Sequence, residues 1–124
     1  NKYNDSKSIE DTTFIIRNTN NKQKKYRIVI EEVEDYKKYS ASRLEPKFVK
    51  FQATIGNDQV RATPLTNETW TDENGKTTYV IYDGTINAQS RVEVALTLYV
   101  DYEPLNNTYQ NKSFIGTIKV YVNE

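Results

Sequence analysis

The sequence predicts an all-β domain, an antiparallel β-sandwich of about seven or eight strands with a jelly-roll or immunoglobulin-like arrangement. Apolar and polar residues alternate over short segments, which is the period of a half-buried strand. Clusters of Asn, Asp and Gly separate these segments, and no long segment has helical spacing. A chain of 124 residues is long enough for one domain. We therefore expect a polar lead-in or tether over residues 1–11 and a single sandwich domain over residues 12–124.

The first two predicted strands lie on either side of an Asn-rich turn. Residues 12–17 are β-branched and aromatic, and they stop at Asn18-Thr-Asn-Asn. Residues 25–33 alternate, with Tyr26, Ile28 and Ile30 on the inward face. Because the connection is tight, we expect these two strands to pair with each other.

A link and two further strands follow. Residues 34–44 combine loose helical spacing with a Ser-Ala-Ser run and a following Pro46, which favours a loop with at most one helical turn. Residues 47–55 alternate with Val49, Phe51, Ala53 and Ile55 inward. Residues 56–58 make a turn into a return strand over residues 59–65. Because Pro64 lacks a backbone N–H, that strand is predicted to lie at a sheet edge.

The second half of the chain carries the sharpest local signal. Asn74-Gly75 predicts a type I′ hairpin turn, with Trp70 before it and residues 77–86 as the second arm. The longest predicted strand, residues 91–102, is expected to be central. Its apolar face comprises Val92, Val94, Leu96, Leu98 and Val100. The last strand, residues 113–122, has Phe114, Ile118, Val120 and Val122 in one register, with Gly116 where a side chain of that face would sit.

The composition removes several classes of function. The chain has no His and no Cys, which takes away imidazole bases, thiolate nucleophiles and the usual zinc and iron ligands. Its 17 basic and 17 acidic residues cancel, so the basic excess typical of nucleic-acid binding is missing. No apolar run reaches the length of a membrane span. We expect no nucleic-acid partner, no membrane span in this chain and no cofactor other than the calcium considered next.

One loop resembles a metal site. Asp101, Glu103, Asn106 and Asn107 follow the longest strand and offer the carboxylate and amide oxygens that calcium prefers. Their spacing does not match an EF-hand, and the same composition is ordinary for a solvated turn. Calcium is therefore a candidate ligand, beside the interpretation as a plain loop.

Four carboxylates gather around the end of the second strand, at Glu31, Glu32, Glu34 and Asp35. Paired carboxylates can hydrolyse glycosides, which makes an accessory hydrolase the enzyme alternative. They fall on both faces of the strand end, so we expect them to be solvated. The chain also lacks a nucleophile elbow, a phosphate loop and a dinucleotide fingerprint. We therefore expect no catalytic residues and no enzyme activity.

The aromatic residues suggest a ligand-binding alternative. Trp70 and the tyrosines Tyr79, Tyr82, Tyr99 and Tyr121 would form an exposed platform for sugar stacking, since Tyr99 and Tyr121 fall opposite the apolar faces of their strands. Tyrosine is also common at outward strand positions because of its β propensity. The two interpretations differ in whether the rings are coplanar and exposed.

Several segments together resemble a known family. They are residues 14–18 (FIIRN), 25–30 (KYRIVI), 85–89 (TINAQ), 94–101 (VALTLYVD) and 112–120 (KSFIGTIKV). This pattern resembles the secreted Gram-positive proteins typified by camelysin and the biofilm matrix protein TasA, whose domains are jelly-roll sandwiches. Generic immunoglobulin-like surface domains share the same hydrophobic spacing. Tyr99 stands where family members commonly carry Trp.

The resemblance implies export, residence at the cell surface or in an extracellular matrix, no catalysis and assembly through an added β-strand. We therefore predict a noncatalytic extracellular structural or adhesive domain of a Gram-positive bacterium, with self-association, another surface protein or a glycan as its partner. The alternative is a carbohydrate- or ligand-binding module. Because the chain starts at Asn1, we expect that any signal peptide or anchor lay upstream.

Overall fold

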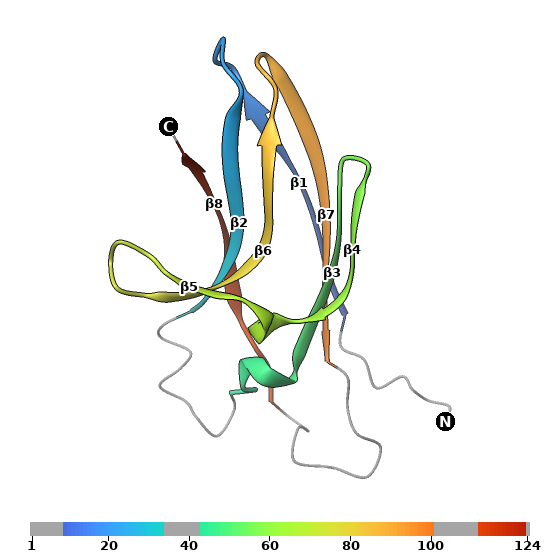
Figure 1. Ribbon diagram of the computed structural model, residues 1–124. Helices are drawn as coiled ribbons and strands as arrows, with labels where there is room; N and C mark the ends of the chain where they lie inside the picture. Colours follow the sequence, from blue (N-terminus) through green and yellow to red (C-terminus); the bar gives the residue numbers. More distant parts are fainter. Residues whose placement is uncertain (1–8, 34–42, 101–111, 124) are drawn as a thin grey trace.

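The computed structural model describes residues 9–33, 43–100 and 112–123, which form two antiparallel sheets of four strands packed as a sandwich (Figure 1). We call the sheet with the order β1-β7-β3-β4 the first sheet and the sheet with the order β5-β6-β2-β8 the second sheet. The strands are β1 (Ile9–Asn18), β2 (Lys24–Glu32), β3 (Val49–Ile55), β4 (Asp58–Pro64), β5 (Thr69–Thr71), β6 (Thr77–Ile86), β7 (Ser90–Val100) and β8 (Gly116–Asn123). Two 3-10 turns are η2 (Pro46–Phe48) and η3 (Leu65–Asn67). The predicted all-β antiparallel sandwich is confirmed.

The pairing of β1 and β2 differs from the prediction. β1 pairs with β7 over its whole length, and β2 pairs with β6 and β8. The prediction that the first two strands pair is wrong because the turn between them crosses from one sheet to the other (Figure 1). The immunoglobulin order, in which the first two strands are neighbours, therefore does not apply. Eight strands divided equally between two sheets match a jelly roll in strand number.

The core lies between the sheets, and most of it consists of inward side chains that the alternation predicts. In β2, β3 and β7 the buried set comprises Tyr26, Ile28, Ile30, Val49, Phe51, Ala53, Ile55, Val94, Leu96 and Val100. β7 is the longest strand and lies between β1 and β3, as expected. Val29 and Val80 are buried although they lie on the outward face of the second sheet, where the β5 hairpin crosses it (Figure 1).

β1 starts at Ile9, three residues before the boundary expected from the sequence. Ile9 pairs with Tyr99 and Asp11 with Thr97, whose hydroxyl donates to the Asp11 carboxylate at 2.8 Å. A polar segment can form an edge strand because the ladder uses backbone groups. Residues 1–8 of the expected lead-in and residues 34–42 of the expected link lie outside the described residues.

The hairpin between β5 and β6 is not the predicted type I′ turn. A type I′ turn needs a positive φ at both Asn74 and Gly75. Gly75 has a φ of +80°. Asn74 does not have a positive φ, because Gln89 is the only non-glycine residue in the described ranges that has one. The Gly75 N–H donates to the Asp72 carbonyl at 3.0 Å, and the Asp72 carboxylate accepts from the N–H groups of Asn74 and Lys76, each at 2.9 Å. The Asp72 side chain thereby stabilises a type I turn that ends in a left-handed glycine.

A buried ion pair holds the segment before η2 against β2. The side chain of Glu32 is 1% exposed, and it accepts hydrogen bonds from Arg43 Nε and Nη2 at 2.7 and 2.8 Å. Arg43 also forms a β-bridge with Ser113. The expectation that this carboxylate cluster is solvated is wrong for Glu32, because Arg43 supplies the charge that a buried carboxylate needs. Glu34 and Asp35 lie outside the described residues.

Candidate functional site

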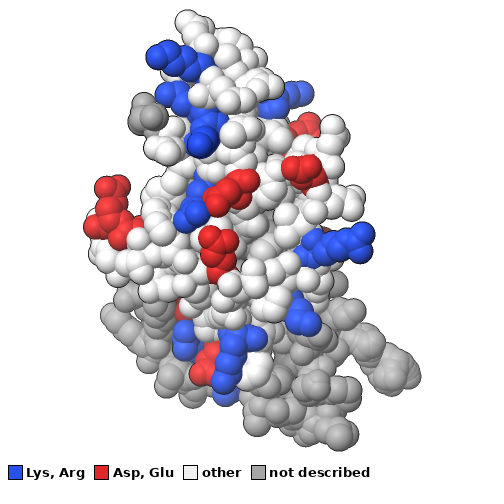
Figure 2. All heavy atoms as spheres, in the orientation of Figure 1, with Lys and Arg blue, Asp and Glu red and all other residues white. Residues whose placement is uncertain are grey.

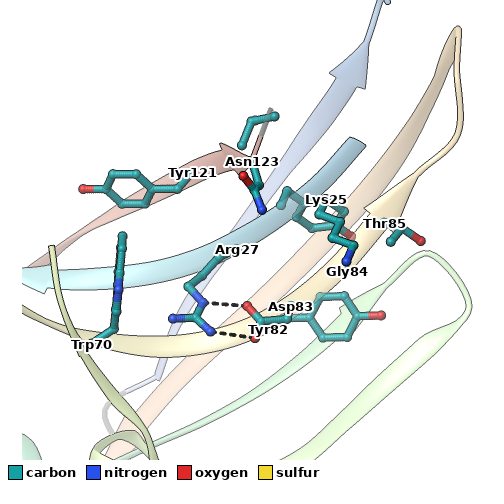
Figure 3. Close-up of a pocket in the computed structure, with 11 residues that line it drawn as sticks. Lys25, Arg27, Trp70, Tyr82, Asp83, Gly84, Thr85, Tyr121 and Asn123 are labelled. Atoms are coloured by element: carbon teal, nitrogen blue, oxygen red, sulfur yellow. Dashed lines mark hydrogen bonds and ion pairs between the residues drawn. The ribbon is translucent and has the colours of Figure 1, made fainter. Parts of the chain in front are cut away.

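The outward face of the second sheet carries a hollow of about 780 Å³ (Figure 3). The strand register places two rows of side chains along it. The first row comprises Asn123, Lys25 and Thr85, and the second row comprises Tyr121, Arg27 and Asp83. Trp70 of β5 lies beside the second row (Figure 3). This volume is typical of pockets that take small molecules.

Arg27 is held by its neighbours in the second row. Its Nε and Nη2 donate to the two carboxylate oxygens of Asp83 at 2.7 and 2.9 Å (Figure 3). Glu68 Oε2 lies 3.8 Å from Nη2, and the guanidinium carbon lies 5.4 Å from the centre of the Trp70 ring. The hydrogen bonds to Asp83 raise the pKa of Arg27 above its ordinary value. Arg27 is thus fixed and its charge is balanced by Asp83.

Trp70, Tyr99 and Tyr121, three of the aromatic residues suggested by the sequence, do not form one platform. The rings of Trp70 and Tyr121 lie 4.9 Å apart at 81°, an edge-to-face pair in place of coplanar rings. Trp70 is half-buried. Tyr99 lies on β7 in the first sheet, where it pairs with Ile9 and Lys50. The structure therefore brings Trp70 and Tyr121 together and places Tyr99 on the other sheet.

Polar contacts hold the β5 hairpin against the outward face of the second sheet. Lys76 of the hairpin and Lys119 of β8 both bind Glu31 of β2, at 3.3 and 2.8 Å. The Tyr121 hydroxyl lies 3.5 Å from the Asp72 carboxylate. The hydrogen bond from Lys119 lowers the pKa of Glu31, and the backbone hydrogen bond from Lys76 lowers that of Asp72. These contacts fix the position of Trp70 beside the hollow.

The edge of β8 is a second surface of interest. Val120 and Val122 are 36% and 53% exposed, whereas Ile28 and Tyr26, their register partners on β2, are 0% and 5% exposed. The first sheet therefore leaves this margin of the second sheet uncovered. β8 is the last strand of its sheet, and its outer edge has no strand partner in the described ranges. The alternation predicted the side on which the valines lie but not their exposure, which depends on how far the opposite sheet extends.

The end of the sandwich beside the hollow is basic. Segments 17–25 and 84–92 contain no acidic residue, and their basic residues are Arg17, Lys22, Lys24, Lys25 and Arg91. Figure 2 shows basic side chains gathered at this end, at the top of the view. The Asn18 amide joins the two turns found there by donating to the carbonyls of Lys22, Ile86 and Asn87 at 2.8, 3.2 and 3.0 Å.

The partnership of Arg27 with Asp83 was not predicted from the sequence. Alternation places Arg27 on the outward face, but its partner follows from the β2–β6 register, which a single sequence does not supply. The four residues suggested for calcium, Asp101, Glu103, Asn106 and Asn107, lie outside the described residues. Among residues 9–33, 43–100 and 112–123, no group of three or more acidic side chains could hold a metal ion.

Comparison with known proteins finds no match among family models, curated proteins or solved structures. The fold alone defines the class of this chain as an antiparallel β-sandwich. In the part of the chain that the structure describes, no helix has the length and apolar character needed to cross a membrane.

Proposed function

We propose that this chain is a noncatalytic extracellular domain, a structural or adhesive component of a Gram-positive cell surface or matrix, and that its copies associate by β-strand addition at β8. The exposure of Val120 and Val122 on an edge strand carries this proposal. An open edge offers backbone donors and acceptors to a further strand. The added strand would place its inward side chains beside the two valines.

β8 is the least protected of the four sheet edges. β5 has only three residues, and β4 ends at Pro64, which has no N–H to donate. The edge strand β1 carries Asp11 and Arg17 on its outward face. Charges, proline and shortness are the usual devices that block edge pairing. β8 has no proline, and its one lysine, Lys119, is bound to Glu31.

Charge and composition also support this function. A formal net charge of zero leaves no overall repulsion between copies. The chain has no His or Cys, and Glu31, Glu32 and Asp83 are each engaged in ion pairs. The extracellular Gram-positive setting rests on the resemblance to the camelysin and TasA family.

Light scattering over a concentration series tests the association. We expect the average mass of the wild-type particles to rise with concentration. The Val122→Lys protein should keep the mass of a monomer, because a charge at this edge opposes pairing. Ile15→Lys, which alters an exposed apolar residue on β1, is the matched control and should behave like the wild type. A wild type that stays monomeric, or an equal effect of both substitutions, would refute the proposal. Repeating the series with calcium tests the loop at Asp101.

A further inference from the structure

We propose that the hollow on the outward face of the second sheet binds an acidic saccharide, a sugar that carries a carboxylate or phosphate group. The site lies on a sheet face, whereas the proposed association uses the edge of β8. Either proposal can therefore fail without the other.

The second row of the hollow is prearranged. Arg27 is held by Asp83 and lies over Trp70, and Trp70 in turn packs edge-to-face with Tyr121. These contacts hold the side chains of the row in place, so a ligand need not order them on binding. Both rings line the hollow, so a sugar bound in it would contact them.

The first row offers hydrogen-bonding groups that the protein does not use. The side chains of Asn123, Lys25 and Thr85 are exposed, and among the described residues they make no hydrogen bond or ion pair. An amide, an ammonium and a hydroxyl in one row provide donors and acceptors for sugar hydroxyls and an acidic group. Their position is set by the register of β8, β2 and β6, on three paired strands.

The charges around the hollow favour an acidic ligand. Asp83 and Glu68 both lie beside Arg27 and offset its charge, which leaves Lys25 as the lining cation without a carboxylate partner in the described ranges. Beyond Lys25 lies the basic end, where Lys22 and Arg17 add positive charge and segments 17–25 and 84–92 contain no acidic residue. A ligand with its sugar ring beside Trp70 and Tyr121 and an anionic group near Lys25 matches this gradient.

Amide shift mapping by NMR with three probes tests the site. The probes are a short galacturonic acid oligomer, a galactose oligomer of the same length, and glucose phosphate. We expect the galacturonate oligomer and glucose phosphate to shift amides in and around the hollow and to leave the outward face of the first sheet unchanged. The uncharged oligomer should bind at least about tenfold more weakly, since it lacks the charge-assisted contact. Binding of only one acidic probe would identify the acidic group.

Matched variants separate a specific contact from general attraction to the basic end. Lys25→Gln should weaken binding of the acidic probes by about tenfold, whereas Lys22→Gln removes the same charge outside the hollow and should have little effect. Trp70→Leu should weaken the binding of both acidic probes, and its amide NMR spectrum over the first sheet must match that of the wild type. Retained binding in the Trp70→Leu protein would refute the aromatic contact. Equal losses in the two lysine variants, equal binding of the uncharged oligomer, or no shifts with any probe would overturn the proposal.

Discussion

At the scale of single residues, Tyr82 of β6 connects the two sheets by donating a hydrogen bond to Asp58 of β4. This hydrogen bond, with some burial, raises the pKa of Tyr82 to about 12. A raised pKa means that the folded state favours the neutral phenol. The contribution of this bond to stability is therefore complete below about pH 10 and lost as the pH rises through about 12.

We expect a spectrophotometric titration to show one tyrosine ionising near pH 12 in the folded protein. Tyr82→Phe should remove that step, and Asp58→Asn should move it toward the ordinary tyrosine value, because the carboxylate acceptor is gone. An unchanged titration curve in both variants would show that another residue causes the step.

Glu32 and Arg43 should respond unequally to substitution. Arg43→Met leaves a carboxylate buried without a partner and should cost about 3–5 kcal/mol of unfolding free energy. Glu32→Gln should cost less, because the Arg43 side chain is 26% exposed and reaches water. Chemical denaturation measures both values, and a larger loss in Glu32→Gln would contradict this account.

Alternation predicts which side of a strand a residue faces, but it does not predict the residue's partner. It places Glu31 and Glu32 on opposite faces without indicating that Lys76, Lys119 and Arg43 neutralise them. Those partners come from β8, from the turn between β5 and β6 and from the segment before η2. Their identity depends on register and on the path of the chain, which propensity and periodicity do not encode.

At the scale of elements, the β5 hairpin depends on its left-handed glycine. A Cβ at Gly75 would meet no atom within 4 Å, so Gly75→Ala should cost only the backbone penalty of about 1–2 kcal/mol. Gly116→Ala provides the contrast, since its Cβ would lie 2.6 Å from Ile30 Cγ2 and clash with the core. Denaturation should rank Gly116→Ala as the more destabilising change, and the reverse order would contradict the described turn.

The short connections show why strands were easier to predict than their pairing. The turn at residues 56–58 joins β3 and β4 in one sheet, as expected. The turn after Asn18 is also short, yet it crosses between sheets. Turn residues indicate where a strand stops. Whether the chain then crosses to the other sheet depends on which strands bury each other's apolar faces. The type I′ prediction at Asn74-Gly75 was wrong for a local reason, the carboxylate of Asp72.

At the scale of the whole molecule, the sandwich depends on β7 as the central strand of the first sheet. Leu96→Asp should unfold the domain, because an unpaired charge would enter the core at a cost of about 4 kcal/mol or more. Ala95→Asp, the neighbouring outward position, should cost only about 1 kcal/mol. Melting curves of the two variants test the register, and a stable Leu96→Asp protein would mean that the faces are reversed.

The placement of β1 and β8 determines how the sandwich responds to tension. β1 begins at one end of the molecule, β8 finishes at the opposite end, and each is an edge strand paired along its length (Figure 1). A force that separates these two ends runs along both strands, while the ladder hydrogen bonds lie across them. The bonds are then loaded in shear and must break together, so they do not open one by one. We expect such a domain to resist a stretching force when it links neighbours in series.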